Sequence, residues 1–219
     1  MDFSQIVQPI KTVLEKYKDN KDFLEIEGRL GIYDSDNKNF DSNIGEEYYN
    51  TIKNLLDSCP EWSETEKSHI TDYFCGSLRL SIDDQGSQRC IEKLKPDRYT
   101  FINESGPLDF RLSISKENPQ KVSKFPSDRS KLKSREKIRN TYYIDNYKFD
   151  LTKVISKENK EIEEYFEFEV EYTGEFQEST DEIVQHIVVK LLDGSFACEN
   201  FIKTKYNTLP LEKVNLLAV

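Results

Sequence analysis

Hydrophobic residues recur first at the spacing of helices and later at the spacing of strands. Two early stretches, from about Ser4 to Lys18 and near Glu46 to Leu56, place their apolar residues on one helical stripe. From about Asp72 apolar and polar residues alternate, which is typical of strands. We expect a third helix near Thr180 to Leu192 and a last strand around Phe196 to Lys203. The pattern predicts a mainly β protein with flanking helices.

Turn-like residues divide the alternating region between Asp72 and Val154 into strands. The strand segments read YFCGSLRLSIDD, QRCIEKLKPDRYTF, PLDFRLSISKE, LKSREKIRNTYYID and YKFDLTKVI. The turns fall at Asp83-Asp84-Gln85-Gly86, Asn103 to Pro107, Asn118-Pro119 and Asp145-Asn146. Two further strands carry alternating glutamates, in LEIEGRLG from Leu24 and in YFEFEVEY from Tyr165. Short connections of this kind favour an antiparallel meander.

The two faces of these strands differ in chemistry, because alternate side chains of a strand point to opposite sides. One face is apolar, as in Leu78, Leu80 and Ile82. The other carries basic rows on some strands and acidic rows on others, with few Thr, Gln or Asn. A sandwich would leave the charged face in water, whereas a barrel of about eight strands would enclose it. The sorting of charges favours the barrel. We therefore expect an α+β fold built on a closed antiparallel eight-stranded tunnel barrel with a charged interior.

Composition limits the class of protein and the ligands that it can meet. The chain has 219 residues, of which 36% are hydrophobic and 33% charged, and it contains 25 Tyr and Phe in all (12 and 13). These values suit a single globular domain over residues 1–219, either complete or the N-terminal part of a longer enzyme. Four cysteines without a C-x-x-C pair argue against a zinc knuckle and favour a reduced, intracellular protein. No signal peptide or membrane span is expected.

The formal net charge of −10 argues against a broad surface for nucleic acid. An anionic ligand therefore needs a local basic pocket, and Lys and Arg cluster around residues 121–139. The acidic rows predict a second kind of site. Glu25 and Glu27 share one face of a strand, as do Glu167, Glu169 and Glu171, so the two rows brought together could hold a divalent metal. Carboxylate oxygens suit Mg²⁺ or Mn²⁺, and no His or Cys cluster favours zinc or iron.

Four segments, in this order, carry a resemblance to a known family: LEIEGRLG, REKIRNTYYID, KFDLTKV and FEFEVEY. They resemble the motifs of the metal-dependent RNA triphosphatases of mRNA capping in fungi, protozoa and large DNA viruses, which are triphosphate tunnel metalloenzymes. The nearest relative is expected to be the N-terminal portion of a mimivirus-type capping enzyme. The resemblance implies a polynucleotide 5′-triphosphatase that removes the γ-phosphate from a 5′-triphosphate RNA end, with Mg²⁺ or Mn²⁺, and that also hydrolyses nucleoside triphosphates.

The resemblance also implies roles for the matching residues. The metal ligands would be Glu25, Glu27 and Glu171, with Glu169 close by. The catalytic group would comprise the basic row that grips the triphosphate, an acid that orients the water, and the aspartate of the basic-x-acid pair that precedes L-T: Arg135, Lys137, Arg139, Glu117 and Asp150. Further substrate contacts would come from basic residues on neighbouring strands, with one of Lys93 or Lys95 filling a family position: Arg79, Lys93, Lys95, Arg111 and Lys148.

Two other functions stay open at this point. Tunnel enzymes that hydrolyse inorganic triphosphate, thiamine triphosphate or free nucleotides typically carry E-x-E-x-K, whereas this chain has Arg29 after Glu25 and Glu27. A non-catalytic module that binds RNA 5′ ends would not need two facing acidic rows. The expected partners are RNA ends, nucleoside triphosphates and an RNA guanylyltransferase, fused or associated. The expected location is the host cytoplasm or virion for a viral protein, and the nucleus for a cellular one.

Overall fold

The computed structural model describes residues 4–17, 23–104, 106–174, 179–202 and 214–217. The helices are α1 (Ser4–Lys16), α2 (Glu46–Ser58) and α3 (Thr180–Ile202), with a short 3₁₀ helix at Val122–Lys124. The strands are β1 (Leu24–Asp34), β2 (Asn39–Asp41), β3 (Glu64–Cys75), β4 (Leu78–Asp83), β5 (Gln88–Lys93), β6 (Asp97–Asn103), β7 (Asp109–Gln120), β8 (Ser134–Ile144), β9 (Tyr147–Glu158), β10 (Glu161–Tyr172) and β11 (Val214–Leu217).

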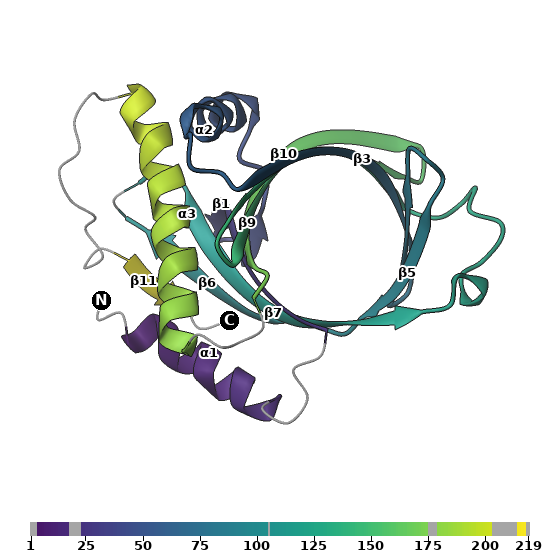
Figure 1. The fold of residues 1–219 in the computed structure, drawn as a ribbon, viewed down its shortest axis with the longest axis horizontal. Helices are drawn as coiled ribbons and strands as arrows, with labels where there is room; N and C mark the ends of the chain where they lie inside the picture. Colours follow the sequence, from purple (N-terminus) through teal and green to yellow (C-terminus); the bar gives the residue numbers. More distant parts are fainter. Residues whose placement is uncertain (1–3, 18–22, 105, 175–178, 203–213, 218–219) are drawn as a thin grey trace.

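Eight of these strands close into an antiparallel barrel. Their order is β1-β10-β9-β8-β3-β4-β5-β7, and the pairing of β7 with β1 closes the ring. Figure 1 looks down this ring, with the helices gathered along one side of it. Strand β2 extends from β1, while β6 and β11 continue outward from β7. The predicted closed eight-stranded barrel is confirmed.

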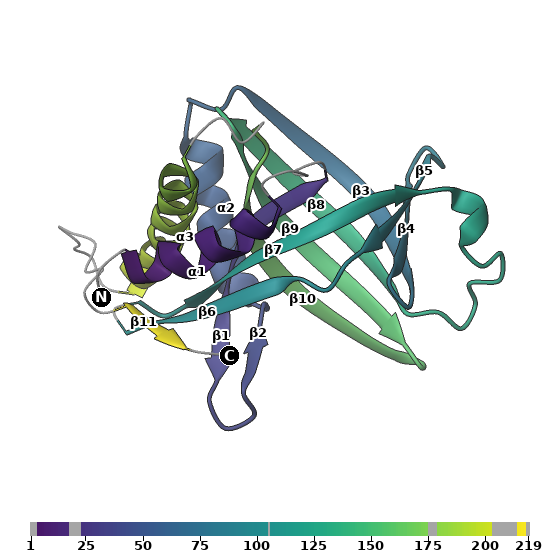
Figure 2. The ribbon, with the colours of Figure 1, turned by 90° about the horizontal axis from the view of Figure 1, so that it is seen from below.

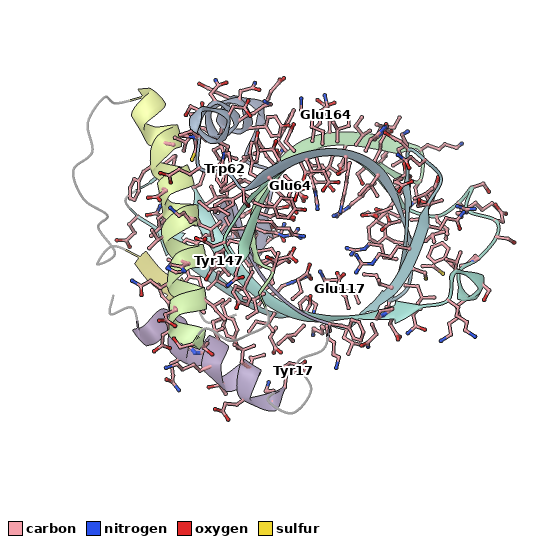
Figure 3. All side chains as sticks on the ribbon, in the orientation of Figure 1. Tyr17, Trp62, Glu64, Glu117, Tyr147 and Glu164 are labelled. Atoms are coloured by element: carbon pink, nitrogen blue, oxygen red, sulfur yellow. The ribbon has the colours of Figure 1, made fainter. Side chains whose placement is uncertain are left out.

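Side-chain alternation sends charge into the lumen and apolar groups to the outer wall. On β1, Glu27 faces the lumen, whereas Ile26 and Leu30 are buried on the outer side. On β10, Glu169 likewise faces inward. Figure 3 shows side chains from all around the wall pointing into the ring, Glu117 among them. The charged face is therefore enclosed, and the sandwich alternative does not describe this fold.

The three helices bury the apolar outer wall on one side of the barrel and form the main core with it. Helix α3 lies close against β1 because β1 has a glycine there. A Cβ added to Gly28 would lie 2.5 Å from Leu191 Cδ1 and 2.6 Å from Ile187 Cγ2. A smaller core, which includes Leu80 and Phe125, covers the opposite side. No helix in the described part of the chain is long and apolar enough to cross a membrane.

Helix α3 differs from the sequence prediction, because it continues to Ile202. The strand predicted from Phe196 is therefore wrong over the described residues, and Lys203 lies outside them. A tertiary contact within α3 accounts for the difference. The Ser195 hydroxyl donates to the Leu108 carbonyl at 3.1 Å and so ties this turn of the helix to the segment before β7.

Three strand predictions also differ from the structure. The segment expected as one strand from about Asp72, YFCGSLRLSIDD, contains the end of β3, a turn at Gly76 and all of β4, and β3 already begins at Glu64. Pro119 does not end a strand but lies within β7, opposite Ile91 of β5. The segment expected as one long strand, QRCIEKLKPDRYTF, divides into β5 and β6, which both pair along the same edge of β7.

The two ends of the barrel are distinguished by their turns. The β3–β4 and β9–β10 turns lie at one end, here named the β9–β10 end, and the β4–β5 and β8–β9 turns lie at the other, the β8–β9 end. Figure 2 shows β8, β9 and β10 running obliquely between these ends. Because β8 starts at the β9–β10 end, Arg135 lies there, whereas Glu171 pairs with Lys148 near the β8–β9 end.

Candidate active site

A charged cavity of about 390 Å³ occupies the lumen. Ten of the fourteen residues predicted from the sequence line it: Glu25, Glu27, Arg79, Lys93, Glu117, Lys137, Arg139, Lys148, Glu169 and Glu171. A larger cavity of about 590 Å³ lies between α2 and α3, outside the barrel. Its wall is apolar, with Trp62 among the lining residues, and it contains none of the predicted residues. The lumen is therefore the candidate active site.

Three glutamates meet at the β8–β9 end of the lumen, because β1 and β10 pair there. Glu27 and Glu171 are direct partners in the β1–β10 register, and Glu25 lies two residues before Glu27. Each of these carboxylates contacts a basic side chain. Glu25 accepts from Lys93 Nζ at 2.7 Å, and Glu171 forms an ion pair with Lys148 Nζ at 2.8 Å. Glu27 accepts from Arg29 Nη2 at 3.0 Å.

The pKa values of these three carboxyl groups are shifted in different directions. Burial raises the pKa of Glu171 to about 7, with help from the neighbouring Glu25 and Glu27 charges and against the Lys148 ammonium. Burial also raises the pKa of Glu27, although Arg29 opposes it. For Glu25 burial acts in the same direction, but the Lys93 ammonium outweighs it and lowers the pKa to about 2. The charge of Glu25 raises the pKa of both Glu27 and Glu171, so the three carboxylates lie close enough to repel.

The donor set of this group fits a divalent cation in its chemistry. Clustered, buried carboxylate oxygens are hard ligands, and the repulsion that raises the pKa of Glu171 is of the kind that a bound Mg²⁺ or Mn²⁺ relieves. Among the described residues, however, no three His, Cys, Asp or Glu side chains stand in a formed metal site. Glu25, Glu169 and Glu171 are instead each turned toward a lysine or arginine. The metal ligands therefore stay a prediction.

Strands β8 and β9 supply the basic wall. Lys137 Nζ forms an ion pair with Asp72 at 2.9 Å, and Arg139 Nη1 donates to Asp150 at 2.8 Å. Burial lowers the pKa of Lys137, with the like charges of Arg139 and Arg79 acting in the same direction against Asp72. Asp150 is only 2% exposed and does not line the cavity. Asp150, which the resemblance places in the catalytic group, therefore holds the Arg139 guanidinium in position.

The opposite wall comes from β4, β5 and β7. Arg79 Nη2 donates to both carboxylate oxygens of Glu117, at 3.0 and 3.1 Å, and Lys93 Nζ lies 3.1 Å from the same group. Lys93 also holds Glu25, so it links Glu117 to the acidic group of β1. Of the two lysines left open by the sequence, the structure places Lys93 in the cavity. Lys95 is exposed in the segment between β5 and β6, away from the lumen cavity, and its predicted substrate contact does not fit this position.

Two other predicted residues lie on the inner face but outside the cavity. Arg135 lies at the β9–β10 end, between the rings of Phe74 and Tyr165, with its Cζ 5.6 Å from each ring centroid. Arg111 lies 4.4 Å over the ring of Phe40 and donates to Thr100 Oγ1 at 2.9 Å. The structure therefore separates Arg135 from Lys137 and Arg139, with which the R-x-K-x-R motif groups it.

Sequence reasoning missed four charged residues that line the cavity: Arg29, Asp72, Asp83 and Arg89. The first two form ion pairs inside it. Arg29 forms ion pairs with Glu169 at 2.6 Å and Glu27 at 3.0 Å, and so joins the two acidic strands. Its position after E-x-E was a signal that could have identified it. Asp72, which is 3% exposed and holds Lys137, had no such signal. It lies on β3, where few apolar residues mark an inner and an outer face.

Solved structures share this fold at low sequence identity. The S. pombe RNA triphosphatase Pct1 is 18% identical with a TM-score of 0.71, and the match covers 87% of this chain and 92% of that chain. The RNA triphosphatase domain of a trifunctional mimivirus mRNA capping enzyme is 15% identical with a TM-score of 0.58, covering 86% and 96%. No curated protein sequence matches the chain.

A family model provides the assignment that these low identities cannot. The family described as mRNA capping enzyme, beta chain, matches residues 27–187, which include all of β3 to β10. The match therefore spans most of the barrel, including both walls of the charged cavity. Because it covers well over half of the sequence, the chain belongs to the mRNA capping enzyme beta chain family.

Proposed function

We propose that the lumen hydrolyses the terminal phosphoanhydride bond of a 5′-triphosphate RNA end, with a divalent metal, in the first step of mRNA capping. The observation that carries this proposal is an enclosed cavity in which the lysines and arginines of β4, β5, β8 and β9 face the glutamates of β1 and β10. A triphosphate needs cations on its oxygens, and its metal needs carboxylates. Family membership supports the RNA end as the substrate.

The basic residues would bind and orient the phosphates. Lys137, Arg139 and Lys148 line one wall and Arg79 and Lys93 the other, so the terminal phosphate can be held from two sides. In hydrolysis the water oxygen forms a bond to the γ-phosphorus and the bridging oxygen keeps the electrons of the broken bond. These cations offset the charge that develops on the phosphate oxygens. Asp150 and Asp72 fix Arg139 and Lys137 in place by ion pairs.

The acids of the lumen would have two uses. Glu25, Glu27 and Glu171, with Glu169 nearby, would hold the Mg²⁺ or Mn²⁺, which when bound supplies Lewis-acid polarisation of the phosphate. Glu117 would orient the attacking water and accept its proton. It is 9% exposed and faces the cavity, while Arg79 and Lys93 hold its carboxylate in one orientation.

The same site also supports a second substrate and a partner. Nucleoside triphosphates present the same triphosphate group to the cavity, so we expect them to be hydrolysed as well. The related mimivirus capping enzyme is described as trifunctional. We therefore propose that this chain works with an RNA guanylyltransferase, which would use the diphosphate end that it produces.

Phosphate release from triphosphate-ended RNA, measured by malachite green with Mg²⁺, with Mn²⁺ and with chelator, tests the proposed function. We expect release with metal, none with chelator, and loss of release in Glu25→Ala and Glu171→Ala. The matched control is Glu164→Ala, which removes an exposed glutamate of the same strand β10 from its pair with Lys153. Release in the presence of chelator, or none from RNA under any condition, would contradict the proposal.

A further inference from the structure

We propose that the RNA chain leaves the lumen through the β9–β10 end, and that Arg135, Phe74 and Tyr165 hold its first nucleotide there. This inference rests on the proposed function and adds to it the direction of the substrate and the residues that distinguish RNA from inorganic triphosphate. Three observations support it: the pairing of the lumen cations, the position of Arg135 along β8, and the charges at the two rims.

Arg135 differs from the basic residues of the cavity because it forms no ion pair with a described carboxylate. Lys137 holds Asp72 and Arg139 holds Asp150, each at less than 3 Å. Arg135 has no carboxylate partner in the part of the chain that the structure describes, and its buried Nε has no hydrogen-bond acceptor there. The Arg135 guanidinium can therefore bind a phosphate oxygen, and the rings of Phe74 and Tyr165 offer faces on which a nucleobase can stack.

The position of Arg135 along β8 indicates the direction in which the RNA lies in the lumen. Arg135, Lys137 and Arg139 are successive inward residues, each about 7 Å from the next, a spacing comparable to the length of a triphosphate chain. The acidic group with Glu25 and Glu171 lies at the opposite, β8–β9 end. A γ-phosphate held by Lys137 and Arg139 beside that group therefore leaves the α-phosphate and first nucleoside near Arg135.

The rim charges agree with this direction. The rim at the β9–β10 end is lined by basic residues of two segments, with Glu158 as an acid among them: Arg129, Lys131, Lys157 and Lys160. The turns at the β8–β9 end carry Asp83, Asp84 and Asp145, which would repel an RNA backbone. In a chain with a net charge of −10, this makes the β9–β10 end the more favourable exit for a polyanion.

Strand β3 offers a matched control. Phe74 points inward to Arg135, and its neighbour Tyr73 points outward to Arg129, whose Cζ lies 5.4 Å from that ring. The two arginine–aromatic pairs thus differ mainly in the side of the wall on which they lie. Arg129→Ala tests the outer groove of the rim as an alternative site for the RNA.

The experiment compares kcat/KM for triphosphate-ended RNA and for inorganic tripolyphosphate in the full chain. We expect Arg135→Ala to lower the value for RNA by about tenfold to a hundredfold more than the value for tripolyphosphate, as for one lost hydrogen bond to a charged group. Tyr165→Leu, which keeps an apolar side chain but removes the stacking face, should lower the RNA value by about fivefold or more. Arg129→Ala removes one charge of the rim but no inward-facing cation, so it should lower the RNA value by less than Arg135→Ala does.

The outcomes separate this inference from the proposed function. Wild-type protein that releases no phosphate from RNA would refute the proposed function, and this inference with it. Active wild-type protein in which Arg135→Ala lowers both substrates equally would overturn the inference alone. A selective loss of RNA hydrolysis in Arg129→Ala as large as that in Arg135→Ala would also overturn it, by placing the RNA on the outer groove. Arg135→Lys, which keeps the charge, guards against misfolding of the alanine variant and should show a smaller loss of the same selectivity.

Discussion

Arg139 serves the lumen and the fold at once, and replacing it with alanine should affect both. Its Nη1 donates to Asp150 at 2.8 Å and its Nε donates to Thr152 Oγ1 at 3.0 Å. Removing one partner of a buried ion pair costs about 3–5 kcal/mol. Lys148 stays 3.7 Å from Asp150, and Arg139 is itself 19% exposed, so we expect the low end of that range. A loss of about 3 kcal/mol lowers the Tm by roughly 6–12 °C, and loss of the guanidinium should lower kcat by about 10²–10³.

A double variant separates the two effects of Arg139. Arg139→Met combined with Asp150→Asn removes both charges, so we expect the free energy of unfolding in urea to recover most of its loss. Phosphate release should stay low, because no cation returns to the cavity. Lys153→Ala is the control: its ion pair with Glu164 lies on the outer wall with both side chains partly exposed, so its loss should change the free energy of unfolding much less than Arg139→Ala does. Recovery of phosphate release together with stability would refute a direct role for Arg139.

Three further predictions concern the wall, the surface and the metal. Gly28→Ala should lower the free energy of unfolding in urea by about 1–3 kcal/mol with kcat unchanged, because the added Cβ would lie 2.5 Å from a side chain of α3. In Gly194→Ala the nearest atom lies 3.2 Å from the added Cβ, so this control should lose less stability. Equal losses in the two variants would contradict this reason. Hydrogen bonding, above all from Lys53, lowers the pKa of Asp57, so its contribution to stability should be full near neutral pH and vanish as pH falls below the usual range of an aspartate. Urea melts of wild type and Asp57→Asn should therefore converge in acid, and a difference that persists there would count against the effect. Glu171→Gln should raise the Mn²⁺ concentration needed for half-maximal phosphate release, whereas an unchanged requirement would remove Glu171 from the metal ligands.

The inner and outer faces of the barrel were predictable because the charged and apolar residues alternate strictly on most strands. On β10, for example, Phe168 and Val170 are buried outside while Glu169 faces the lumen. The same rule fails at the start of β3, where Glu64 to Lys67 are exposed and no apolar face exists to mark a strand. Asp72 was missed for this reason, although it is among the most buried acids.

Features that depend on contacts between distant segments were not predictable from local pattern. Residues around Phe196 alternate as in a strand, yet the hydroxyl of Ser195 and the close packing of Gly194 on Phe168 keep α3 helical there. The grouping of Arg135 with Lys137 and Arg139 is correct for one face of β8, but the motif carries no information about partners. Only the folded barrel shows which of these cations holds an acid and which does not.

The ion pairs that fill the lumen would exchange partners when a triphosphate binds. Lys93 and Lys148 already have glutamate counterions, so a phosphate oxygen that takes either ammonium sets a carboxylate free. That carboxylate then becomes a vacant ligand for a divalent cation. Triphosphate and metal should therefore bind with positive cooperativity, each raising the affinity for the other by the same factor.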